Sequence, residues 1–191
     1  MNKENSGYAL LVRTLLALTI ILLAAALRVA PHPWNFTPVG AMALFSGALV
    51  RDRRLAYAFP LAALFAGDVF VGFYKVPVML IVYASFLLSV LIGRFLEGRR
   101  TITRIAGATL LGSIQFFLIT NFAAWWLLGS YPKTAAGLAN CYAAGLPLFW
   151  NTLGGDAFYS ALFFGAFALA EHFVPILREP ARAAAGNPPM L

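Results

Sequence analysis

The sequence predicts an all-α integral membrane protein, built as a bundle of six transmembrane helices with both termini in the cytoplasm. Its 191 residues are 61% hydrophobic and only 11% charged, whereas soluble domains carry roughly 25% charged residues. The charged residues are also segregated, with long apolar runs between them. Such runs are typical of membrane spans, so the chain is expected to form one multi-span domain.

Six apolar segments are the candidate spans: residues 13–29, 38–50, 55–73, 76–96, 105–128 and 146–174. The second is short, since about 20 residues are needed to cross ~30 Å as a helix. We expect it to be tilted, packed tightly inside the bundle, or preceded by non-helical chain at membrane depth. The last is long, and Gly154 and Gly155 are expected to bend or divide it. Residues 1–12 and 176–191 are the expected cytoplasmic tails, the second of them disordered.

Basic residues alternate between the connections. The segment Arg51–Arg54 and the segment 94–104 are rich in arginine, whereas the other connections hold at most one lysine each. The positive-inside rule then places both segments in the cytoplasm, in a bacterial inner membrane. This rule explains the net charge of +7 better than a nucleic-acid-binding face does. The bilayer is therefore the expected partner, and nucleic acid is not.

Polar side chains within and beside the spans are displaced toward the outer side. At about 1.5 Å per residue, Asp68, Asn121 and Asp156 all fall in the outer half of their spans. An ionised carboxylate facing lipid is costly, so both aspartates must face protein or water. We therefore predict an outward-facing pocket. The candidate substrate-binding residues are Arg28, His32, Asn35, Asp68, Asn121, Tyr131, Tyr142, Asn151 and Asp156.

Each of these residues also has a structural interpretation. Arg28 could pair with an aspartate simply to tie spans together. Asn35 and Asn121 could be loop and helix caps. All four tryptophans fall at the outer end, where they could form an interfacial belt or line an aromatic cavity for a flat or amphipathic molecule. The stretches "FAGDVF" and "LGGDAF" each follow an Asn-Phe pair by about thirty residues, which suggests a structural repeat that pairs Asp68 with Asp156.

No catalytic or cofactor motif is present. The sequence contains no P-loop, His-Glu-x-x-His, Gly-x-Ser-x-Gly or Cys-x-x-Cys. An enzyme is not expected, and acid–base chemistry would have to rest on Asp68 and Asp156 alone. No cofactor or resident metal is expected either. The single cysteine, Cys141, is either inert packing or, with His32, a ligand to a metal-bearing substrate.

Three stretches carry a resemblance. "PHPWNFTPVGAMALFSGA", "AGDVFVGFY" and "YPKTAAGLANCYAAGLPLFWNTLGGDAFYSALFFG" resemble the signature stretches of a family of uncharacterised small bacterial membrane proteins labelled as transport proteins. The architecture is also similar to the substrate-binding S components of energy-coupling-factor vitamin transporters, which are six-span proteins with ligand sites near the outer face. That similarity implies a partner ATPase module. The Ala-x-x-x-Ala spacing that docks such modules is met here by Ala26 and Ala30, but at the outer end of the first span.

Two functional hypotheses follow. The first is a membrane protein that binds and takes up a small, vitamin-like organic nutrient, with energy from a partner ATPase or an ion gradient. The second is a non-transporting assembly or scaffold protein, in which the outer polar residues only hold helices together. A small-molecule ligand separates the two hypotheses, because only the first protein should be stabilised by one.

Overall fold

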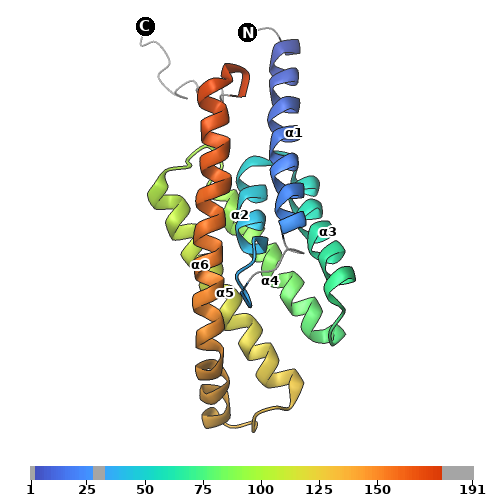
Figure 1. The fold of residues 1–191 in the computed structure, drawn as a ribbon, viewed down its shortest axis with the longest axis vertical. Coiled ribbons are helices and arrows are strands. Elements are labelled where there is room, and N and C mark those ends of the chain that lie inside the picture. The colour runs from blue at the N-terminus through green and yellow to red at the C-terminus, as the bar shows by residue number, and fades with distance from the viewer. Residues whose placement is uncertain (1–2, 28–32, 178–191) are drawn as a thin grey trace, which may run out of the picture.

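The structure, a computed structural model of the chain, describes residues 3–27 and 33–177, so Arg28 and His32 lie outside the described residues. Within these ranges every regular element is helical (Figure 1). The helices are α1 (Lys3–Leu27), α2 (Val39–Leu49), α3 (Arg53–Val71), α4 (Val76–Arg94), α5 (Ile102–Leu128) and α6 (Ala135–Phe173), followed by the short 3₁₀ helix η1 (Pro175–Leu177).

Four of these helices are long and apolar enough to cross a membrane: α1, α4, α5 and α6. Helix α2 is apolar but has only 11 residues, a length of about 17 Å against the ~30 Å of a bilayer core. Helix α3 has 19 residues but begins with two arginines, and it is not among the four. The fold is therefore that of a helical membrane protein.

The short helix α2 forms the centre of the bundle. All of its residues are buried, and it packs against α1, α3, α4, α5 and α6. A Cβ atom at Gly47 would collide with the Val90 carbonyl, and one at Gly93 would collide with the Leu44 carbonyl. Glycine on both helices thus lets the α2 and α4 backbones touch, which is how membrane helices commonly associate. Of the three alternatives expected for the second span, the structure shows the tight packing inside the bundle.

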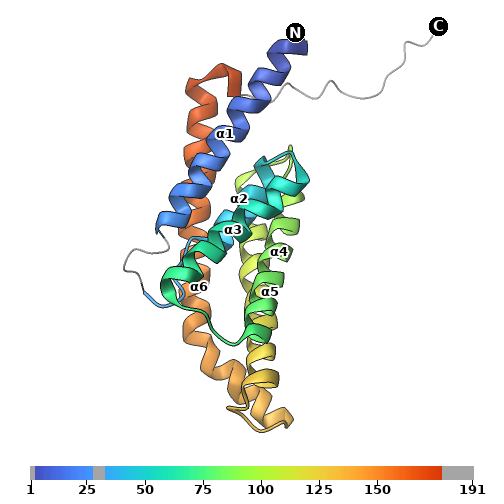
Figure 2. The ribbon, with the colours of Figure 1, turned by 90° about the vertical axis from the view of Figure 1, so that its right-hand side faces the viewer.

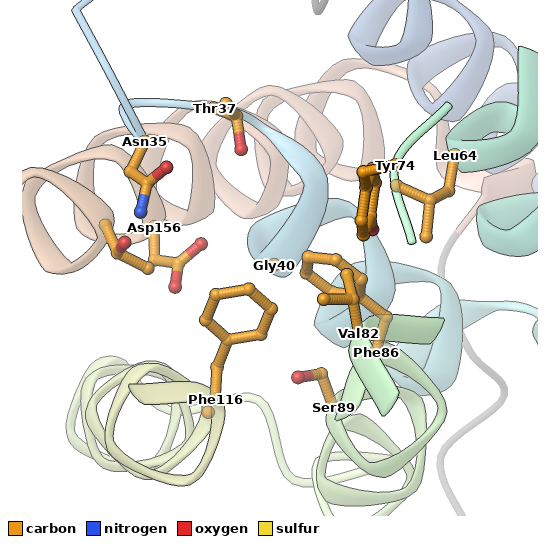
Figure 3. A pocket seen from close by; sticks show the side chains of 12 residues that line it. Asn35, Thr37, Gly40, Leu64, Tyr74, Val82, Phe86, Ser89, Phe116 and Asp156 are labelled. Atoms are coloured by element: carbon orange, nitrogen blue, oxygen red, sulfur yellow. The ribbon is translucent and has the colours of Figure 1, made fainter. Parts of the chain in front are cut away.

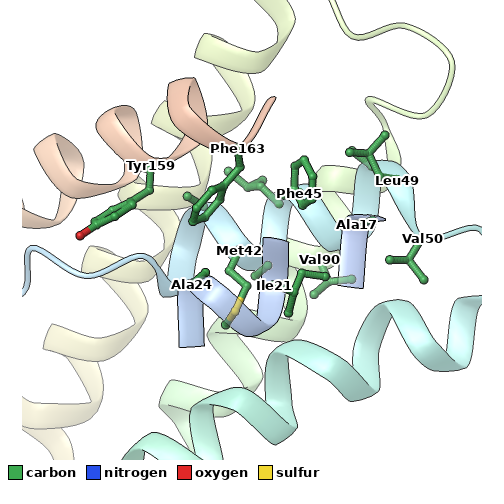
Figure 4. Close-up of a cluster of buried hydrophobic side chains, with 14 of the residues drawn as sticks. Ala17, Ile21, Ala24, Met42, Phe45, Leu49, Val50, Val90, Tyr159 and Phe163 are labelled. Carbon is green, nitrogen blue, oxygen red and sulfur yellow. The ribbon is translucent and has the colours of Figure 1, made fainter. Parts of the chain in front are cut away.

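Aromatic and small side chains fill the space around α2 (Figure 4). Phe45 of α2 makes edge contacts with the rings of Phe163, Phe164 and Phe167 on α6, with ring centroids 5.3–5.9 Å apart. From the opposite side, α1 contributes the buried residues Ala17, Ile21 and Ala24. The core is consequently a single cluster to which all six α-helices contribute.

Two of the expected segment boundaries are wrong. Helix α1 begins at Lys3, so most of the expected tail 1–12 continues the first helix. Helix α6 begins at Ala135 and runs unbroken for 39 residues, whereas residues 135–145 were expected to be a loop. The Thr134 side chain starts this helix by accepting a hydrogen bond from the Gly137 amide, 3.1 Å away. Of the two alternatives for Gly154-Gly155, a bend or a division, the continuous helix excludes the division.

The connections separate into two ends of the molecule (Figures 1 and 2). The start of α1, the end of α6, the α2–α3 turn and the α4–α5 loop lie toward one end, and the α3–α4 and α5–α6 loops lie toward the other. The two arginine-rich segments therefore share an end, although their side of the membrane stays a prediction. At that end Glu171 binds Arg13 (2.8 Å) and Arg100 (3.1 Å), which ties α1 and the α4–α5 loop to α6.

Candidate functional site

The start of helix α2 is capped by a residue from another helix. Asp156 of α6 is only 4% exposed, and its carboxylate accepts hydrogen bonds from Ser113 Oγ of α5, at 2.7 Å, and from the Ala41 backbone. Pro38, the N-cap residue of α2, supplies no side-chain cap. The Asp156 side chain therefore provides the hydrogen-bond acceptor that the N-terminus of α2 otherwise lacks.

Glycine is required where Asp156 approaches α2. A Cβ atom at Gly40 would collide with the Asp156 carboxylate, so the oxygen atoms reach the α2 backbone only because that side chain is missing. Helix α2 has only 11 residues, all of them buried, and the other five α-helices surround it. Its first turn therefore lies within the bundle, and its first amide groups need an acceptor there.

The segment before α2 lies along α6. Asn151 Nδ2 donates to the Trp34 carbonyl at 2.9 Å, and the Phe36 ring packs against Phe158 and Tyr159 of α6 with centroids 6.0 and 5.9 Å apart. At Gly155 an added Cβ would lie 3.1 Å from the Thr37 nitrogen. The Gly154-Gly155 pair thus permits a close approach of this segment.

A cavity of about 220 Å³ lies beside the Asp156 carboxylate (Figure 3). One side is polar and holds Asn35, Thr37 and Asp156, and the opposite side holds the Tyr74 ring and Leu64. Its lining residues come from the segment before α2, the α3–α4 loop and five helices: Asn35, Thr37, Gly40, Leu64, Tyr74, Val82, Phe86, Ser89, Gly112, Phe116, Thr152 and Asp156. A carboxylate, an amide and hydroxyl groups facing aromatic rings can bind a small molecule that has hydrogen-bond donors and an apolar part.

Comparison with known proteins identifies a family. A family model described as a family of unknown function (DUF6580) matches residues 9–177. The chain belongs to the DUF6580 family. No curated protein matches the chain, and no solved structure matches it. The function of this DUF6580 protein must therefore be argued from the geometry of its site.

The second buried aspartate of the DUF6580 chain lies in a different environment. Asp68 of α3 is 1% exposed, and it accepts a hydrogen bond from the Tyr83 hydroxyl of α4 at 2.8 Å. It is not one of the cavity-lining residues. Helix α3 packs against α1, α2 and α4 but makes no extensive contact with α6. The structure thus gives Asp68 and Asp156 separate partners, and Arg28, their expected cation, lies outside the described residues.

Several other predicted residues lie at the α5–α6 contact, away from the cavity. Asn121 Nδ2 donates to the Phe117 carbonyl of its own helix at 2.9 Å. The Cys141 thiol contacts the Asn121 carbonyl at 3.4 Å, and the Tyr142 hydroxyl donates to the Leu118 carbonyl at 2.8 Å. Tyr131, which is half-buried, does not line the cavity either. Of the nine predicted site residues, the structure places Asn35 and Asp156 at the cavity.

The tryptophans do not form the predicted aromatic cavity. Trp125 Nε1 donates to the Pro132 carbonyl at 2.9 Å, and the Lys133 ammonium lies 5.1 Å from the Trp125 ring. Trp34, Trp126 and Trp150 are exposed. The aromatic wall of the observed cavity comes instead from α4, α5 and the α3–α4 loop.

Sequence reasoning did not find Tyr74, Phe86, Ser89, Ser113 and Phe116. One signal was available for two of them. Ser89 and Ser113 are hydroxyl residues inside apolar spans, and both are fully buried. Serine in a membrane helix commonly marks a helix–helix contact or a polar site. Phe86 and Phe116 gave no comparable signal, since many other apolar residues surround them in the sequence of their spans.

Proposed function

We propose that this DUF6580 protein is a six-span, inner-membrane protein that binds a small organic nutrient for uptake, with both termini in the cytoplasm. The supporting observation is the cavity in which the Asp156 carboxylate and Asn35 face Tyr74, Phe86 and Phe116. A buried carboxylate beside a hollow is unusual in a membrane domain, and residues of this kind commonly mark a ligand or ion pathway.

The cavity indicates the class of ligand. Its volume of about 220 Å³ is below the ~300–1,000 Å³ of pockets for drug-sized molecules, so the ligand is compact, such as a small vitamin-like molecule. Asp156 and the Asn35 amide favour a ligand with a hydrogen-bond donor or a positive charge at one end. The rings favour a flat, apolar part at the other end.

The segment 33–38 is the part of the site best placed to respond to the ligand. It lies between α6 and the start of α2, and it contributes Asn35 and Thr37 to the lining. A ligand that binds better when this segment is in place shifts the protein toward that state. Net uptake then needs energy from a gradient or from a partner ATPase module, as the similarity to S components suggests.

The scaffold hypothesis also has an observation in its favour. Asp68, Asp156 and Asn121 each have a hydrogen-bond partner within the protein. Polar residues satisfied in this way can simply hold helices together. The two hypotheses differ in whether the cavity binds a small molecule.

A thermal-stability panel tests the proposal. The purified protein is melted in detergent with a panel of vitamins and other small nutrients, and a specific ligand at 100 times its Kd should add about 2.7 kcal/mol of stability. Val82→Trp fills the cavity, whereas Leu80→Trp adds the same ring on the exposed face of α4. The shift should persist in Leu80→Trp and disappear in Val82→Trp. No stabilising compound, or an equal shift in both variants, would favour the scaffold.

A further inference from the structure

A second hollow, unrelated to the proposed nutrient site, is a groove between the first half of α5 and the second half of α6. Its volume is about 790 Å³. On α6 its lining extends from Leu153 to Glu171. This stretch is about 27 Å long at the helical rise, which is close to the ~30 Å thickness of the bilayer core. The lining residues are Gly98, Arg100, Ile102, Ile105, Ala106, Thr109, Leu110, Leu153, Ala157, Ser160, Ala161, Phe164, Gly165, Phe167, Ala168 and Glu171.

Small apolar residues form the α6 side of this groove. Ala157, Ala161 and Gly165 follow one another at four-residue spacing, so they lie on one face of α6, and all three are exposed. The hydroxyl groups at its floor bind each other, since Thr109 Oγ1 donates to Ser160 Oγ at 3.1 Å. Small side chains and paired hydroxyls leave a surface that suits a hydrocarbon chain.

One end of the groove is basic. Arg100 lines it and binds Glu171 at 3.1 Å. Arg99 and Arg104 do not line the groove, but each is next in sequence to a lining residue, Arg100 or Ile105. Both are exposed, and neither forms an ion pair with any residue the structure describes. The mouth of the groove therefore carries an excess of positive charge.

We propose that this groove binds an anionic phospholipid. One acyl chain lies along Ala157, Ala161 and Gly165, and the phosphate group lies among Arg99, Arg100 and Arg104. A chain-shaped apolar groove with a cluster of arginines at its end matches the two parts of such a lipid. Basic pockets between membrane helices bind anionic head groups in this manner, and each basic residue near the surface adds to the attraction. A zwitterionic lipid offers the same chain without the net negative charge.

Native mass spectrometry with two lipids of identical chains tests the charged end. The purified protein is mixed with equal amounts of dioleoyl-phosphatidylglycerol and dioleoyl-phosphatidylcholine, and each lipid adduct is titrated. The wild type should retain the glycerol lipid preferentially. Replacing both Arg99 and Arg104 with Gln should weaken that adduct roughly 30-fold. The control, Arg51→Gln with Arg53→Gln, removes the same charge from the other basic segment and should change it less than about 3-fold.

Two tryptophan substitutions test whether the acyl chain lies in the groove. Ala161→Trp fills the groove, and Leu162→Trp places the same ring at the next residue, which is exposed but does not line the groove. Ala161→Trp should lose the phosphatidylglycerol adduct and Leu162→Trp should keep it. Because the arginine variants leave the groove intact, a folding defect in Ala161→Trp leaves the charge test decisive.

Three results would overturn the proposal. Equal retention of the two lipids by the wild type would remove the role of charge. Full retention by the Arg99/Arg104 variant would place the lipid elsewhere. A dimer mass that Ala161→Trp abolishes would show that a second copy of the chain occupies the groove.

Discussion

At the start of α2 and at the α5–α6 contact, a polar side chain packs directly against a glycine, but only the first of these side chains lies beside a cavity. In the first region Asp156 lies against Gly40, and in the second Asn121 lies against Gly145, with no room for a Cβ atom at either glycine. Asp156 is held by α5 and by the α2 backbone, and a cavity lies beside it. Asn121 donates to its own helix, and it lines no described cavity.

The difference arises from helix length. Helices α5 and α6 have 27 and 39 residues and lie side by side through the region of Asn121, so their side chains fill the space between them. Helix α2 has only 11 residues, so its first turn lies inside the bundle and needs a cap there. In this comparison, the polar residue beside a cavity is the one that lies where a neighbouring helix begins.

The largest expected effect comes from adding one methyl group to each glycine. Gly40→Ala should lower the free energy of unfolding by about 3 kcal/mol, because the carboxylate cannot move without leaving both Ser113 and α2. Gly145→Ala should cost about 1 kcal/mol, because the half-buried Asn121 amide gives up a single bond when it rotates away. Unfolding in mixed detergent micelles measures both. Equal losses would show that the two regions are alike.

Removing the side chains of Asp156 and Asn121 should give a smaller difference in the free energy of unfolding between the two regions. Asp156→Ala should cost about 2 kcal/mol, because it removes two buried hydrogen bonds and leaves the first α2 amides without an acceptor. Asn121→Ala should cost about 0.5–1 kcal/mol, since one neutral bond is lost. The same unfolding measurement applies. A larger loss for Asn121→Ala would reverse the assignment of the central polar contact.

The smallest difference in stability is expected when a neighbouring hydroxyl group is removed from each region. Ser113→Ala removes one donor to Asp156 and should cost about 1–2 kcal/mol, because the carboxylate stays buried. Tyr142→Phe removes an exposed hydrogen bond to the Leu118 carbonyl and should cost less than about 0.5 kcal/mol. Melting temperatures in one detergent suffice to rank these variants, and a ranking with Tyr142→Phe first would contradict the comparison.

The sequence predicts the helical class and the central, short second helix, because composition and segment length determine both. It does not predict that α6 includes residues 135–145. That stretch contains Gly and Asn, which usually indicate turns, but the Thr134 cap and packing against α5 through Tyr142 and Cys141 stabilise a helix there. Local turn preference was outweighed by contacts between distant residues.

The candidate site is predictable only in part. Asp156 and Asn35 could be found because a carboxylate in an apolar run and an amide in an outer connection stand out. Phe86 and Phe116 could not, because apolar residues are spread over most of α4 and α5 and the sequence does not separate lipid-facing from cavity-facing rings. The role of Gly40 could not be predicted either, since it depends on contact with Asp156, 116 positions later in the sequence.

The most direct measurement is a density map of the protein purified from native membranes or with the best compound from the panel. The account predicts a compact feature, separate from the chain, between the Asp156 carboxylate, Asn35 and the Phe116 ring. A cavity collapsed onto its own side chains, or occupied by water alone under saturating ligand, would contradict it.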